Sequence, residues 1–114
     1  MKYMLLIHPG ASRAEFENLP REQQEAIYGE YTALAQAPGI LDGQQLQPAA
    51  TATTVRVDGG RTLTTDGPFV ATKEELGGYY LCEAADLDAA IELAARIPAA
   101  RMGGAVEVRP VVER

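Results

Sequence analysis

Two titratable side chains occupy positions that could support acid–base chemistry. Asp66 lies in the segment Thr65-Asp66-Gly67-Pro68-Phe69, and His8 follows a short apolar run. Asp before Gly-Pro favours a rigid turn, which would fix a carboxylate as a general acid, a general base or a hydrogen-bond acceptor. The same residues also suit a purely structural turn in which Phe69 anchors the loop against the core. His8 could exchange protons near neutral pH or simply end a strand.

Other kinds of site chemistry have little support in the sequence. Cys82 is the only cysteine, so neither an intrachain disulfide nor a cysteine-based metal site can form. It lies in an apolar segment where a free cysteine usually acts as a small buried hydrophobe. With a single histidine and no carboxylates at ligand spacing around it, we expect no metal site and no cofactor. The pairs Gly59-Gly60 and Gly103-Gly104 lack the G-x-G-x-x-G pattern and are expected in turns.

The size and charge of the chain restrict its partners. A length of 114 residues, 46% of them hydrophobic, predicts one folded domain over residues 1–114. The formal net charge is −6 and the ten basic residues are scattered, so neither nucleic acid nor an anionic membrane surface is expected as a partner.

The hydrophobic segments are too short for a membrane protein. The N-terminal apolar run spans about six residues, which is below the roughly 7–15 of a signal-peptide core. No apolar stretch approaches the length of a membrane span. A cytoplasmic location is therefore the expectation.

The first half of the chain predicts a strand, a helix and further strands. Residues 3–7 form a continuous apolar run closed by Pro9-Gly10. Ile27, Tyr31 and Leu34 recur at helical spacing within a helix expected over residues 20–37. Residues 40–46 suit an irregular or edge strand. Alternation over 51–57 and 61–65, around Asp58-Gly59-Gly60, predicts a β-hairpin.

The second half predicts a strand, a helix and a final strand. Residues 77–83 suit a strand that places Tyr79 and Tyr80 on opposite faces. Asp86 can cap a helix whose buried stripe is expected to comprise Leu87, Ile91, Ala94 and Ile97. Residues 105–112 alternate as a last strand. With the hairpin as an insertion, this order is the α+β, ferredoxin-like βαββαβ plan with an antiparallel sheet. One sheet face would then need a cover, commonly a second subunit.

A long segment of the chain resembles a known family. Residues 65–80, from Thr65-Asp66-Gly67-Pro68-Phe69 through Lys73-Glu74-Glu75 to Gly77-Gly78-Tyr79-Tyr80, look like the signature of the YCII-related, or DGPF-domain, proteins. The resemblance extends to residues 1–7, 46–56 and 107–111. It implies a ferredoxin-like fold that pairs into a dimeric α+β barrel, and it implies no settled activity.

The resemblance also directs attention to site residues. The YciI-like branch of the family is proposed to use a His–Asp pair whose histidine lies on the first helix. This chain departs from that pattern, because its first helix offers Gln24, Tyr28 and Tyr31 and no histidine. We therefore take Asp66 and His8 as the catalytic candidates. The candidate substrate-binding residues are Tyr31, Gln47, Phe69, Lys73, Glu74 and Tyr79.

Two functions follow as hypotheses. The first is a homodimeric small-molecule-binding protein or enzyme that uses the acidic loop residue Asp66. The second is a non-catalytic regulatory or interaction module, because DGPF-type proteins resemble domains associated with extracytoplasmic-function sigma factors.

Overall fold

The computed structural model describes residues 1–70 and 74–114, and its centre is a four-stranded antiparallel sheet. The strands follow the order β2-β5-β1-β6 across the sheet. Their bounds are Ile40–Gln45 for β2, Gly78–Glu83 for β5, Lys2–His8 for β1 and Ala105–Pro110 for β6. This is the strand order of the ferredoxin-like plan, as predicted, with β1 paired on both sides.

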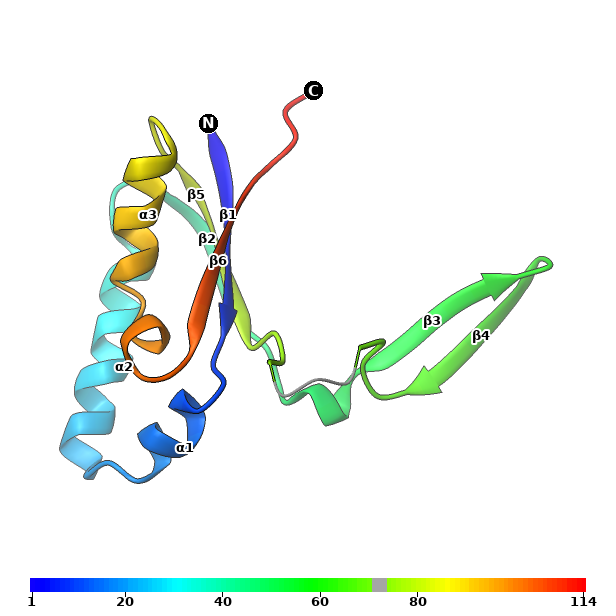
Figure 1. Cartoon of the computed structure of the whole chain (residues 1–114), viewed down its shortest axis with the longest axis horizontal. Coiled ribbons are helices and arrows are strands. Elements are labelled where there is room, and N and C mark those ends of the chain that lie inside the picture. Colours follow the sequence, from blue (N-terminus) through cyan, green and yellow to red (C-terminus); the bar gives the residue numbers. More distant parts are fainter. Residues whose placement is uncertain (71–73) are drawn as a thin grey trace.

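Two longer helices and one short helix accompany the sheet. They are α1 at Ser12–Glu17, α2 at Arg21–Ala35 and α3 at Leu87–Ala95. Figure 1 shows α2 and α3 side by side on one face of the sheet, with α1 at its lower end. Two 3₁₀ turns, η1 at Ala49–Thr51 and η2 at Pro98–Arg101, complete the described elements. The sheet and its helices are called the body below.

Alternation along the strands determines which side chains are buried. Tyr3, Leu5 and Ile7 of β1 face the helices and are at most 8% exposed. In β5, Tyr80 and Cys82 face the same way, whereas Tyr79 points to the opposite face, as the two-residue period requires. Cys82 is fully buried, and burial raises the pKa of its thiol. The expected structural role of Cys82 thus agrees with its position.

Helix α3 begins as predicted, and its expected buried stripe is confirmed for Ala94 and Ile97 but not for the other two residues. The side chain of Asp86 caps it, because its Oδ1 accepts a hydrogen bond from the amide of Ala89 at 2.9 Å. The expectation that Leu87 and Ile91 are buried is wrong, since they are 49% and 47% exposed. The stripe that packs on the sheet consists of Ala90, Ala94 and Ile97.

The predicted hairpin forms a two-stranded ribbon. Strand β3, Thr53–Asp58, pairs with β4, Arg61–Asp66, and Gly59 and Gly60 turn between them with positive φ. Figure 1 shows this ribbon standing away from the body, and we call residues 53–66 the arm. Val57 on the arm is 70% exposed.

Phe69 does not anchor its loop against the core, which corrects the sequence-based expectation. Its ring is 73% exposed and lies next to the arm. The guanidinium carbon of Arg56 is 5.6 Å from the centre of that ring, which is a cation–π distance.

The face of the sheet opposite the helices is partly apolar. Met4 and Leu6 of β1 and Leu81 of β5 point toward it and are half-buried. No helix among the described residues covers this face. It is the open face that the sequence pattern predicted.

Candidate functional site

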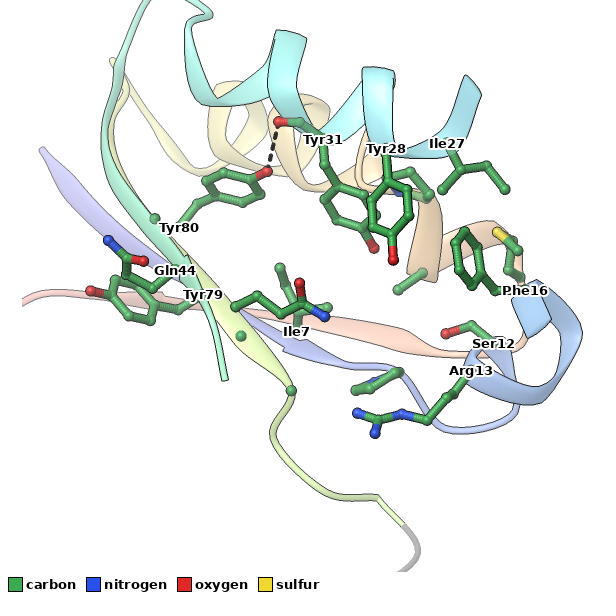
Figure 2. Close-up of a pocket in the computed structure, with 18 of the residues that line it drawn as sticks. Ile7, Ser12, Arg13, Phe16, Ile27, Tyr28, Tyr31, Gln44, Tyr79 and Tyr80 are labelled. Carbon is green, nitrogen blue, oxygen red and sulfur yellow. Dashed lines mark hydrogen bonds between the residues drawn. The ribbon is translucent and has the colours of Figure 1, made fainter. Parts of the chain in front are cut away.

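A cavity lies between the sheet and the first two helices. It has a volume of about 490 Å³, within the roughly 300–1,000 Å³ of small-molecule sites. We call it the tyrosine pocket, and Figure 2 shows the side chains that line it. Its lining includes Ser12, Arg13, Phe16, Tyr28, Tyr31 and Tyr80.

Aromatic rings form much of the wall of this pocket. Tyr31 and Tyr28 project from α2, and Phe16 projects from α1 (Figure 2). The rings of Phe16 and Tyr28 meet edge to face, with centres 5.1 Å apart. This contact holds α1 against α2 at the mouth of the pocket.

Tyr80 joins the sheet to the helix across the inner end of the pocket. Its hydroxyl donates a hydrogen bond to the backbone carbonyl oxygen of Tyr31 at 3.0 Å (Figure 2). Burial raises the pKa of both Tyr31 and Tyr80, so both phenols stay protonated at neutral pH. The wall is therefore uncharged and can donate hydrogen bonds.

The short helix α1 is held in place by backbone and side-chain bonds. The amide of Ser12 donates to the carbonyl oxygen of Pro9 at 2.8 Å, which turns the chain from β1 into the helix. Gln24 of α2 donates to the carbonyl oxygens of Phe16 and Leu19, both at 3.1 Å. Gln24 therefore supports the loop between the two helices.

The 3₁₀ turn η2 closes the remaining side. Pro98 and Ala99 are buried and line the pocket with Met102. Arg101 of η2 reaches α2, where its guanidinium lies 2.5 Å from a carboxylate oxygen of Glu30. The pocket thus combines residues from both ends of the sequence.

Of the proposed site residues that the structure describes, two line this pocket. Tyr31 belongs to its wall, and Tyr79 lies at its rim beside Gln44 (Figure 2). The hydroxyl of Tyr79 donates to a carboxylate oxygen of Asp42 at 3.2 Å, and this hydrogen bond raises the pKa of Tyr79. Gln47 and Phe69 are exposed and line no part of the pocket. Lys73 lies outside the described residues.

His8 lies at the rim of a second, open hollow. Its Nδ1 is 3.0 Å from the carbonyl oxygen of Glu74, so a proton on Nδ1 donates to that oxygen. The same hollow is also lined by Glu74, Glu107, Gly103 and Gly104. His8 therefore does not line the tyrosine pocket.

Asp66 lies at the base of the arm, opposite Thr53. Gly67, which follows it, has φ of +97°. The amide of Gly67 donates to the carbonyl oxygen of Ala52 at 2.7 Å, and its own carbonyl oxygen accepts from the hydroxyl of Thr54 at 2.8 Å. In one chain the Asp-Gly-Pro segment therefore fastens the base of the arm. Figure 1 separates the ends of β1 and β4, so His8 and Asp66 do not meet within one chain.

Sequence reasoning missed Ser12, Arg13 and Phe16. They lie in residues 11–19, a segment too short to show helical periodicity. The available signal was Phe16 itself, because the chain has only two phenylalanines. A large aromatic residue shortly after Pro9-Gly10 indicates that the segment packs against another part of the fold. The local sequence pattern does not show which part.

Comparisons with known proteins decide the family. The model of the YCII-related domain matches residues 1–114. The chain belongs to the YCII-related family. Uncharacterized protein R00369 of Rhizobium meliloti (strain 1021) is 43% identical to it over 96 residues, which cover 80% of this chain and 77% of the relative.

Two further properties of the described residues concern metals and membranes. In the ranges 1–70 and 74–114, no three His, Cys, Asp or Glu residues are grouped so that they could hold a metal ion. In the same ranges, no helix combines the length and the apolar character needed to cross a bilayer.

Proposed function

We propose that this YCII-related protein binds a small molecule in the tyrosine pocket and acts as a homodimer. The observation that carries the binding function is a cavity of about 490 Å³ with aromatic walls and a few polar groups. Such a cavity is the usual form of a small-molecule site. The fold alone would not support this conclusion, because related folds host many functions.

The surface of the chain supports the dimer. A compact monomer of 12.2 kDa is expected to expose about 6,100 Å². This chain exposes 7931 Å², an excess of about 1,800 Å² over that expectation. A standard interface buries about 800 Å² on each partner, and obligate dimers bury more. The excess therefore matches the area that an obligate pairing would cover.

The arm accounts for much of this extended shape. The radius of gyration is 16.0 Å, against about 13 Å for a compact chain of this length. An isolated two-stranded ribbon is at best marginally stable in water. Val55, Val57 and Leu63 leave apolar surface on the arm, and the open sheet face offers apolar surface as well. A second copy of the chain would cover the apolar surface of the arm and that of the open sheet face at once.

A neutral dye tests the pocket. N-phenyl-1-naphthylamine should increase in fluorescence on binding to the wild-type protein. Ala35 lines the pocket at its rim, so Ala35→Trp should weaken dye binding by about tenfold or more. Ala33→Trp is the matched control, because Ala33 is exposed on the same helix and does not line the pocket. Equal affinities of the two variants for the dye would refute binding in the tyrosine pocket.

Light scattering tests the dimer. The wild-type protein should have twice the 12.2 kDa mass of one chain. Val55→Lys with Val57→Lys should shift it to a monomer, because charges would be buried at the interface. Ile91→Lys is the control, since Ile91 is 47% exposed on α3, away from the arm. A dimer that survives the arm variant and dissociates in the control would place the interface elsewhere.

The acidic-residue hypothesis remains part of this proposal. Because His8 and Asp66 lie apart in one chain, a catalytic pair would have to form between two copies. His8→Gln and Asp66→Asn should then each reduce turnover of a bound substrate without changing the dimer. If both variants keep full turnover, neither residue is catalytic.

The exposed arm also suits the second hypothesis, an interaction module. If the wild-type protein is monomeric at micromolar concentration, its arm is available to bind a different protein. That result would favour the regulatory function over the homodimer.

A further inference from the structure

Ser12 places an unpaired hydroxyl in the tyrosine pocket. The residue is only 6% exposed. Among the described residues, the Ser12 hydroxyl has no hydrogen-bond partner. Every fully buried side-chain oxygen or nitrogen in this part of the chain does have a partner. The hydroxyl oxygen must therefore retain access to the cavity, and Figure 2 shows it directed inward. A buried hydroxyl that faces a cavity without a partner is available to a ligand.

Arg13 is the next residue and lies at the mouth of the same pocket. Figure 2 shows its side chain extending from α1 toward the sheet. Among the described residues, it is the one cationic residue that lines the pocket, and it forms no ion pair with any of them. A guanidinium donates two parallel hydrogen bonds to a carboxylate.

The rest of the pocket restricts the shape and charge of the ligand. The rings of Phe16, Tyr28 and Tyr31 provide flat apolar surface, which suits a planar molecule. Glu17 is also at the rim and is the one acidic residue that lines the pocket. A second negative charge on the ligand would be repelled there.

We infer that the tyrosine pocket takes a planar, conjugated monocarboxylate, whose carboxylate is bound by Arg13 and Ser12. This inference rests on the proposed binding function and deepens it by naming the ligand class. The conjugated part of the ligand lies among the aromatic rings, and the carboxylate remains at the mouth. A multiply charged phosphate does not suit the site, because a single arginine opposes Glu17 there.

Two probes of nearly identical shape test the charge of the ligand. They are 2-naphthoate and 2-naphthamide, and their affinities are compared by displacement of the neutral dye. The wild-type protein should bind the carboxylate about tenfold more tightly than the amide, as a charge-assisted hydrogen bond predicts. Raising NaCl from 0.05 to 0.5 M should reduce this preference without affecting the amide.

Variants then assign the preference to particular residues. Arg13→Gln should abolish the preference for the carboxylate and leave the affinity for the amide unchanged. Ser12→Ala should reduce the preference by a few-fold. Arg21→Gln is the matched control, because Arg21 pairs with Glu25 on the outside of α2 and does not line the pocket. A carboxylate preference that persists in Arg13→Gln would overturn the inference.

The outcomes separate this inference from the function on which it rests. If the dye and both probes bind but the carboxylate and the amide bind equally, the pocket stands and the anion site is wrong. If neither the dye nor a probe binds, the binding function itself is wrong.

Discussion

The body and the arm differ in how much apolar surface they bury within one chain. Both pair their strands by backbone hydrogen bonds. In the body, Leu5, Cys82 and Ile97 are fully buried, whereas Val57 and Phe69 by the arm are 70% and 73% exposed. Hydrogen bonding contributes little net stability compared with apolar burial. The body can therefore be stable alone, whereas the arm gains little stability from apolar burial within its own chain.

The largest expected effect comes from a cavity in the body. Leu5→Ala should lower the free energy of unfolding by about 3 kcal/mol, because Leu5 is 0% exposed at the centre of the core. Val57→Ala on the arm should change it by less than about 0.5 kcal/mol in dilute monomeric protein. Urea denaturation at low protein concentration compares the two. A cost at Val57 as large as that at Leu5 would contradict the division into body and arm.

Gly67 should affect the arm and leave the body unchanged. A Cβ at this position meets nothing within 4 Å, but the φ of +97° is unfavourable for any other residue. Gly67→Ala should therefore cost about 1–2 kcal/mol through backbone strain. Because Gly67 fastens the base of the arm, amides of residues 53–66 should exchange with deuterium about tenfold faster. Faster exchange in β1 and β5 as well would show that the arm and the body unfold together.

Two adjacent tyrosines extend the comparison to the two faces of the sheet. Tyr80→Phe removes a part-buried hydrogen bond to the carbonyl oxygen of Tyr31 and should cost about 1 kcal/mol. Tyr79→Phe removes an exposed bond to Asp42 and should cost less than about 0.5 kcal/mol. Thermal unfolding of both variants measures the difference. A larger loss for Tyr79→Phe would mean that the open face is covered and that its bonds are buried there.

The fold could be predicted because its strands are marked by apolar runs or by alternation between turn residues. Val106 and Val108 pack on the core while Glu107 between them is exposed, as the two-residue period requires. Helix α3 shows where this reasoning fails. Its sequence permits two apolar stripes, and hydrophobicity favours the one with Leu87 and Ile91. The sheet packs instead against the smaller side chains of Ala90 and Ala94, which allow close approach.

The site was harder to predict, because it depends on contacts between distant segments. Tyr31 could be proposed because the family resemblance directs attention to the first helix, and the helical spacing of the apolar residues there includes Tyr31. Ser12 and Arg13 can be recognised as site residues only in the folded chain, where η2 and β5 close the pocket around them. Phe69 shows the reverse error, since its apolar character predicted a core position and the chain carries it to the arm. Local patterns define which residues are apolar and leave open which surface they contact.

The smallest effect concerns Gly29, on the outer surface of the body. Gly29 lies within α2, is exposed, and a Cβ there would meet nothing within 4 Å. Gly29→Ala should therefore raise the free energy of unfolding by about 0.5–1 kcal/mol, because alanine loses less conformational entropy in a helix. Denaturation measures the gain, and the dye affinity should not change, since Gly29 does not line the tyrosine pocket. A loss of stability would mean that another surface, such as a second copy, packs against this part of α2. The exposed face of α2 would then belong with the arm among the regions that depend on outside contacts.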